Sequence, residues 1–562
     1  MNRLIILLFL FYISSAFSQP PDAGSILQQL EQEQLTQPQF ENYRQKNIEK
    51  DEVGLEADLR VEIKQIVFQG NENISDSELS DVFNSYLGQK TSFNDLQQLA
   101  RMVGEYYRGK GLWARAILPE QSLEDGILII KIIEGKLGNL NIQHGEKKLN
   151  IDEEKAKKYL LNNQKSDAIF NIKEFEKSVK NLNNYPGVSA VAILKPGENK
   201  GFTDAEIKMM NTSLFSGSLR TDNYGSRSTS KHGQRLVGYF NFDGLLSLGE
   251  QINFQFVKSS GLDVKTIGSS FPLGYEGSRI GVSYTDLAYE LGHPLTSIDG
   301  KGDAQIISAY FNKPLVNEDT KSIDTKIQFT KKNFYNETIA GETSDKSTKA
   351  FTANVSFKWQ APAIKVNNRA SLSYVFGGLD LRDNDADYVN DSTTAENHGN
   401  YDKFLFSFNR SQYLNASNEV WISTFGQYAL DNLDSSEKIS LGGPTGVRAF
   451  PSGEGFGDTG AVVNLELRHY FKDNISGMLF YDYGWVKKHK NTWSNWNTRN
   501  EPNHYHIDGA GVGLKWTLNQ RFNFLGYLSK RLANNPSPDS NGKDIDGSSH
   551  DTRLWISLVG QF

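Results

Sequence analysis

The spacing of apolar residues changes abruptly near residue 213. From there to residue 562, apolar and polar positions alternate with a period of two, as in Ile252, Phe254 and Phe256 with polar residues between them. The same alternation recurs at 351–359, 463–470 and 553–562. A period of two places alternate side chains on opposite faces of a strand. At about 22 residues per strand and connection, this region predicts an all-β transmembrane barrel of about 16 antiparallel strands.

Residues 61–136 and 137–212 show a different pattern, which occurs twice. Each segment has a strand, two amphipathic stretches of helical period and two further strands. Ser75 and Glu78 have the spacing of a capping box at the start of one predicted helix. Such a tandem repeat predicts two small α+β domains before the barrel.

The first 60 residues contain three kinds of segment. Residues 1–18 have an arginine, an apolar run and small residues, which predicts a cleaved signal peptide. Residues 24–37 predict a short helix, and residues 38–60 a charged linker. The helix carries a narrow apolar stripe of Ile26, Leu27, Leu30 and Leu35. An isolated polar helix of this length is unstable, so it is expected to dock elsewhere in the molecule; a disordered arm is the alternative.

The amino-acid composition argues against several classes of function. The chain is 38% hydrophobic and 12% aromatic, which fits a membrane barrel and also a secreted β-rich protein. A net charge of −7 argues against nucleic acid as a partner, and the lack of cysteine excludes thiol chemistry and cysteine-bound metal. No phosphate loop, nucleophile elbow or zinc-protease motif is present. We therefore expect neither an enzyme nor a cofactor or metal site, and interpret His504 and His506 as solvated loop residues.

One glycine-rich stretch, Leu441–Gly460, contains a single basic residue, Arg448. Glycines normally indicate a flexible loop. Taken alone, this stretch is therefore interpreted as a flexible turn around one fixed cation.

The order of segments, together with local motifs, resembles the two-partner secretion transporters (TpsB proteins) of the BamA superfamily. The segment from Tyr106 to Leu137, with Pro119, Gln121, Gly126, Glu134 and Gly135, is similar to the first POTRA domain of that family. Asp222–Thr229 is similar to its first barrel strand. The resemblance implies a Gram-negative outer-membrane exporter of adhesins, haemolysins or contact-dependent inhibition toxins. It also implies POTRA domains in the periplasm, contact with outer-membrane lipid and a monomeric state.

The same resemblance implies roles for particular residues. Val447, Arg448, Ala449 and Phe450 stand in place of the family's V-R-G-[FY] loop motif, with alanine replacing glycine. The arginine is expected to reach Asp482 in an F-x-D-x-G motif, here Phe480, Asp482 and Gly484. Residues 24–37 are expected to plug the pore.

Partner recognition is expected at an edge strand of the second POTRA domain, with Val188, Ala190, Ala192 and Leu194 at the binding edge. The alternative is an edge that is only shielded, by Lys195 and Pro196. We expect export without ATP, since no motif for its use is present. Two other functions remain open: a BamA-like factor that assembles other barrels, and a passive porin.

Overall fold

The computed structural model describes residues 20–36, 60–123, 125–164, 168–199, 201–292, 295–497 and 501–562. The first helix is α2 (Ala23–Thr36), which agrees with the helix expected at 24–37. The predicted signal peptide and all of the predicted linker except Arg60 lie outside the described residues, and Arg60 begins the first strand. No helix among these residues has both the length and the apolar character to cross a bilayer.

The first small domain combines a mixed sheet with two main helices. Its elements are β1 (Arg60–Glu62), β2 (Gln65–Gln69), α3 (Asp76–Phe83), η1 (Asn84–Tyr86), β3 (Lys90–Ser92), α4 (Phe93–Gly109), β4 (Ala114–Ile117) and β5 (Ile127–Glu134). The sheet order is β2-β5-β4, with β2 and β5 parallel. Ser75 caps α3 by accepting from the Glu78 N–H, as its spacing predicts. Alternate β5 residues, Leu128, Ile130 and Ile132, enter the core.

The second small domain repeats the arrangement. Its elements are β6 (Lys136–Gln143), α5 (Glu153–Leu161), α6 (Ile172–Asn183), β7 (Val188–Pro196) and β8 (Phe202–Asn211). The sheet order is β6-β8-β7, which leaves β7 at an edge. Backbone hydrogen bonds join the two domains, because Trp113 donates to Phe170 and Phe170 donates to Gly135, at 3.0 and 2.7 Å.

The remainder of the described chain forms a closed antiparallel barrel of sixteen strands, which confirms the predicted fold. The strands are β9 (Phe215–Asp222), β10 (Arg235–Asp243), β11 (Gln251–Lys258), β12 (Leu262–Leu273), β13 (Ser278–Glu290), β14 (Lys301–Asn317), β15 (Lys321–Thr338), β16 (Gly341–Ala361), β17 (Val366–Asp380), β18 (Gly399–Tyr413), β19 (Asn418–Ala429), β20 (Thr459–Lys472), β21 (Ile475–Lys487), β22 (His504–Thr517), β23 (Phe522–Arg531) and β24 (Thr552–Gln561). β24 pairs with β9 and closes the cylinder.

Sequence alternation determines which side chains face outward. In β20, Leu465 and Leu467 are exposed on the outer surface, while Asn464, Glu466 and Arg468 are buried on the inside. In β24, Leu554, Ile556 and Leu558 point outward. An apolar outer band around a polar interior is the arrangement that a lipid bilayer requires of a barrel.

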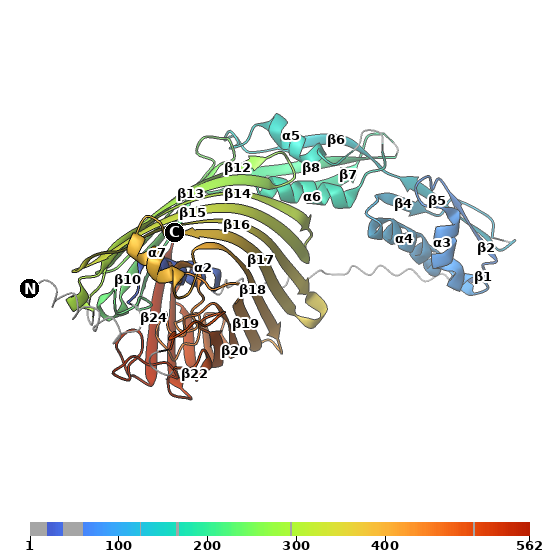
Figure 1. The fold of residues 1–562 in the computed structure, drawn as a ribbon. Helices are drawn as coiled ribbons and strands as arrows, with labels where there is room; N and C mark the ends of the chain where they lie inside the picture. The colour runs from blue at the N-terminus through green and yellow to red at the C-terminus, as the bar shows by residue number, and fades with distance from the viewer. Residues whose placement is uncertain are drawn as a thin grey trace, which may run out of the picture.

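The connections differ at the two ends of the barrel. At the end beside the second small domain they are short turns. At the other end most are longer, including the one that contains α7 (Asp385–Ser392), while β11–β12 and β15–β16 are joined by short turns. The second small domain contacts the barrel through Tyr185, whose hydroxyl donates to the Ser247 carbonyl at 3.1 Å. Tyr159 packs edge-on against Tyr275, with ring centroids 5.1 Å apart. In Figure 1 the two small domains form an arm beside the barrel, and α2 lies among the barrel strands.

Candidate functional site

The connection between β19 and β20, residues 430–458, folds back into the barrel and is called loop 6 here. It forms a hairpin in which Ile439 and Gly457 exchange backbone hydrogen bonds of 2.8 and 2.9 Å. The segment around its tip is buried, including Leu441, Val447, Ala449 and Phe450. The glycine-rich stretch therefore forms an ordered part of the barrel interior.

Arg448 is brought to the residue that the resemblance implied. Its Nε and Nη2 donate to the two carboxylate oxygens of Asp482, at 2.9 and 2.6 Å, and its backbone N–H donates to the same carboxylate at 3.0 Å. Arg448 is 3% exposed and Asp482 is fully buried. A bidentate pair of this kind fixes both the position and the plane of the guanidinium.

A second carboxylate, Glu466, also binds this arginine. Glu466 accepts from Arg448 Nη1 at 2.6 Å and from Arg468 Nε at 2.7 Å, so it bridges the two cations. The Arg448 guanidinium carbon lies 3.6 Å from the centroid of the Phe480 ring. The alternation of the strand places Glu466 and Arg468 only on its inner face, and the folded loop reveals their connection to Arg448.

Two glycines in the barrel wall make room for the loop motif. A Cβ at Gly509 would lie 2.4 Å from the Ala449 Cβ, and a Cβ at Gly484 would lie 2.9 Å from Val447 Cγ2. Both distances are too short for real side chains. The alanine that replaces the family glycine is thus accommodated by a glycine on β22, and Gly484 of the F-x-D-x-G motif accommodates Val447.

Helix α2 lies inside the barrel, as the plug interpretation expects. Ile26 and Leu27 are buried against residues from several strands, and Leu30 is partly buried in the same cluster. The side chain of Leu35 lies outside the described ones. The cluster includes Leu262, Leu287, Ala304 and Phe334, which come from β12 to β15. The apolar stripe of the helix therefore docks on the inner wall.

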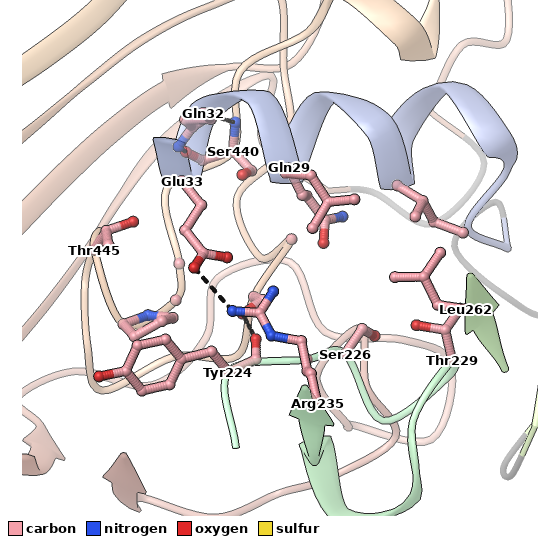
Figure 2. A pocket seen from close by; sticks show the side chains of 18 of the residues that line it. Gln29, Gln32, Glu33, Tyr224, Ser226, Thr229, Arg235, Leu262, Ser440 and Thr445 are labelled. Atoms are coloured by element: carbon pink, nitrogen blue, oxygen red, sulfur yellow. Dashed lines mark hydrogen bonds and ion pairs between the residues drawn. The ribbon is translucent and has the colours of Figure 1, made fainter. Parts of the chain in front are cut away.

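Three carboxylates bind α2 and the residue before it to the barrel. Asp22 lies 3.1 Å from Lys346, Glu31 lies 3.0 Å from Lys332, and Glu33 lies 2.7 and 2.8 Å from Arg220 and Arg235. Figure 2 shows Glu33 facing Arg235 beneath the helix. The sequence pattern had pointed only to the apolar stripe, because the cations come from strands far away in the chain.

Each of these cations also has a carboxylate partner outside the helix. Lys346 contacts Asp434 at 2.9 Å and Lys332 contacts Glu437 at 3.5 Å, both in loop 6. Arg220 and Arg235 both lie 2.8 Å from Asp222 of β9.

The helix is also linked directly to loop 6. Gln32 donates to the Ser440 carbonyl at 2.7 Å and accepts from the Ser440 N–H at 3.2 Å. In Figure 2 these two residues face each other. A Cβ at Gly24 would lie 2.7 Å from the Ser436 Cβ, so the start of the helix also lies close against the loop.

The expected partner-binding strand, β7, has a free edge, but its expected side chains face inward. Val188 and Ala190 are buried in the domain core, and Ala192 and Leu194 pack against that core. The opposite face of the strand carries Ser189, Val191 and Ile193, of which Val191 is 55% exposed. At the four expected positions, therefore, the side chains face the domain core and the backbone lies at the edge.

No cluster of three or more His, Asp or Glu residues suited to a metal ion occurs among the described residues. His504 and His506 lie on strand β22 and not in a loop, and His506 stacks on Tyr483, with ring centroids 5.6 Å apart.

Comparison with known proteins identifies the family. Residues 201–516 match the model of the haemolysin secretion/activation proteins ShlB/FhaC/HecB, and residues 61–135 match the ShlB-type POTRA domain. The heme/hemopexin transporter protein HuxB of Haemophilus influenzae strain 86-028NP is 27% identical over 96% of this chain and 95% of its own length. The outer membrane transporter CdiB of Dickeya dadantii is 24% identical over 76% of each chain.

Solved structures agree on the fold. CdiB from Escherichia coli superposes with a TM-score of 0.70 at 17% identity, covering 97% of this chain and 100% of that one. BamA from Haemophilus ducreyi lacking POTRA domains 1–3 gives a TM-score of 0.51 at 14% identity, with 90% and 100% covered. The chain belongs to the ShlB/FhaC/HecB family of two-partner secretion transporters, which are outer-membrane translocators of partner proteins and not enzymes.

Proposed function

We propose that this chain binds its partner in the periplasm on the free edge of β7 and exports it through the barrel once α2 leaves the lumen. The partner is a secreted protein of the adhesin, haemolysin or toxin class. The observation that carries the proposal is the combination of an internal helix, held by ion pairs and hydrogen bonds as well as by a short apolar stripe, with a periplasmic strand that pairs on one side only.

The ion pairs around α2 favour a reversible plug over a permanent one. When α2 leaves, Lys346 keeps Asp434, Lys332 keeps Glu437, and Arg220 and Arg235 keep Asp222. A buried charge that loses its partner is strongly destabilised, by about 3–5 kcal/mol. Lys346 then keeps Asp434, whereas Arg220 and Arg235 share Asp222 and Lys332 shares Glu437 with Lys403, so the open lumen avoids part of that cost.

Loop 6 is proposed to remain in the barrel when the plug leaves. Its contacts with the wall through Arg448, Asp482 and Glu466 are buried and charge-assisted, whereas its contact with α2 through Gln32 is a neutral amide pair. Charge-assisted bonds are about twice as strong as neutral ones. Loop 6 is therefore expected to stay bound to the wall when its link to α2 through Gln32 breaks.

Export is proposed to proceed without nucleotide hydrolysis, driven by folding of the partner outside the cell. A passive porin is less favoured, because a helix and a loop occupy the lumen of this barrel. A barrel-assembly factor shares the fold, and a test of secretion separates the two.

The first experiment identifies the partner. Culture medium from cells with and without this chain is compared by mass spectrometry, and the partner is a large protein lost from the medium when the chain is absent. Loss of many outer-membrane barrels instead would indicate an assembly factor.

The second experiment locates the binding edge. The chain lacks cysteine, so a single introduced thiol is unique. Val191→Cys places the thiol on the exposed face of β7, and Ala190→Cys, its matched control, places it in the core. The identified partner, stalled during export, should cross-link to residue 191 and not to residue 190. Cross-links confined to barrel positions would contradict recognition at β7.

A further inference from the structure

The free edge of β7 has one backbone position that a side chain already occupies. The Asn183 amide donates to the Ala190 carbonyl at 2.9 Å, and the Ala190 N–H donates to Asn183 Oδ1 at 2.7 Å. A residue of an antiparallel partner strand would form the same pair of bonds. The side chain of Asn183 therefore imitates one residue of an incoming strand.

These two bonds also show which backbone groups of β7 point toward the free edge. Because both polar groups of Ala190 point away from β8, and the direction alternates along a strand, those of Val188, Ala192 and Leu194 point the same way. A partner strand that pairs along the whole edge would therefore have to bond to the backbone of Ala190, where Asn183 is bound.

Asn183 is held in place by the fold around it but is accessible. It is the last residue of α6 and is exposed, whereas Ala190 is buried. Two residues later, Tyr185 is buried and bonds to the Ser247 carbonyl of the barrel. The end of α6 is thus fixed, while the Asn183 side chain has room to rotate away.

The first POTRA domain contains the same device at an independent position. Gln121 donates to the Ile129 carbonyl at 2.8 Å and accepts from the Ile129 N–H at 2.7 Å. Ile129 lies in the part of β5 beyond the end of β4, whose pairing stops at Lys131. In both domains a side-chain amide thus covers a strand position that another strand could pair with, which protects against unwanted edge pairing.

We propose that Asn183 is a removable cap on the binding edge and sets a threshold for partner binding. This proposal rests on the proposed function. A partner strand must displace Asn183, and at Ala190 it gains only the two hydrogen bonds that the cap gives up. Net binding therefore depends on additional pairing at Ala192 and Leu194. The cap selects for a segment with several consecutive residues in extended conformation and against short or irregular peptides.

The test uses the full-length protein in detergent and a synthetic peptide with the sequence of β8, Phe202–Asn211. β8 pairs antiparallel with the full length of β7, so the peptide matches the strand in length. A fluorescent label on Val191→Cys reports binding. Asn183→Ala should raise the affinity about tenfold, equivalent to about 1.4 kcal/mol. Asn184→Ala, which changes the neighbouring exposed asparagine, is the matched control and should leave the affinity unchanged.

Hydrogen exchange at the Ala190 amide provides a second measurement. Asn183→Ala should speed exchange of this amide in the free protein, and the peptide should slow it again. Asn183→Asp keeps an acceptor for the Ala190 N–H but sets a carboxylate against the Ala190 carbonyl, so it should raise the affinity as well. It serves as the test if the alanine variant does not fold. If the folded Asn183 variants bind the peptide with unchanged affinity, Asn183 does not cap the edge of β7. Failure of the peptide to bind at residue 191 of any variant would instead count against β7 as the binding edge.

Discussion

Asp482 binds Arg448 at three points, two on the guanidinium and one on the backbone N–H. The pair therefore fixes the path of the loop as well as the arginine side chain. Asp482 thus joins the tip of loop 6 to strand β21 inside the barrel through a side-chain contact that is separate from the backbone hydrogen bonds between strands. This separation allows loop position and barrel stability to be tested independently.

Arg448→Ala should strongly reduce secretion while the protein still migrates as a folded, heat-modifiable barrel. The substitution leaves the Asp482 and Glu466 carboxylates facing each other without their shared cation, a local cost of about 3–5 kcal/mol for a buried pair. Barrel closure comes from strand pairing and should persist. Secretion of the partner into the medium, relative to the amount of folded barrel, is the measurement.

Asp482→Ala should give a milder defect, because Arg448 retains Glu466. The double variant should be no worse than Arg448→Ala alone, as expected for coupled residues. Arg382→Ala is the control, since this arginine pairs with Asp380 at the exposed surface. Normal secretion by both single variants, or defects that add, would show that the pair does not act as a tether.

Gly509→Ala should displace loop 6, because its new methyl group would meet the Ala449 Cβ at 2.4 Å. Ala449→Gly by itself removes one buried methyl group and should cost about 1 kcal/mol. Combined, the two substitutions move the methyl group from the loop to the wall and should restore secretion in part. Protease access to loop 6 in intact cells reports its displacement. If the double variant secretes as poorly as Gly509→Ala alone, the contact with Ala449 is not the cause of the secretion defect.

Gly24→Val should loosen the plug, since a Cβ at this position would lie 2.7 Å from the Ser436 Cβ. Ion conductance in planar bilayers should rise toward that of a variant lacking residues 20–37, while secretion continues. Gln34→Ala changes an exposed residue of the same helix and should leave conductance at the wild-type level. If the deletion variant conducts no better than the wild type, α2 does not close the pore.

Tyr107 supplies a pH-dependent contribution to the first POTRA domain. Burial, together with a 2.9 Å hydrogen bond to Glu134, raises the pKa of its phenol above the ordinary value. The neutral phenol is therefore favoured in the folded state, and this contribution is complete below pH about 10 and is lost as the pH rises further. Tyr107→Phe should lower the free energy of unfolding of the domain by about 1 kcal/mol at pH 8.

The same variant should lose less stability than the wild type between pH 8 and pH 11. Proteolysis of the domain within the full chain measures the difference. Tyr86→Phe, whose phenol donates to the Met102 sulfur, is the control. If the wild type and Tyr107→Phe lose equal stability between pH 8 and pH 11, the pH dependence does not come from the Tyr107 phenol.

Much of the architecture could be predicted because it depends on local periodicity. The alternation at Val463, Leu465 and Leu467 already separates the outer face of β20 from the inner one, and the predicted capping residue Ser75 begins α3. The Arg448–Asp482 contact was expected only through the family resemblance, since no local pattern connects residues on a loop and a later strand.

The barrel, the repeated small domains and the amphipathic helix could be predicted from the sequence alone, because side-chain period and capping are properties of neighbouring residues. The contacts between distant groups depend on the folded chain: Glu33 with Arg220 and Arg235, Ala449 with Gly509, and Asn183 with Ala190. The tertiary structure also placed the side chains of Val188 and Ala190 in the core of the second small domain. Closing a barrel or docking a helix brings residues together by their position in space, and the one-dimensional pattern carries no record of those distances.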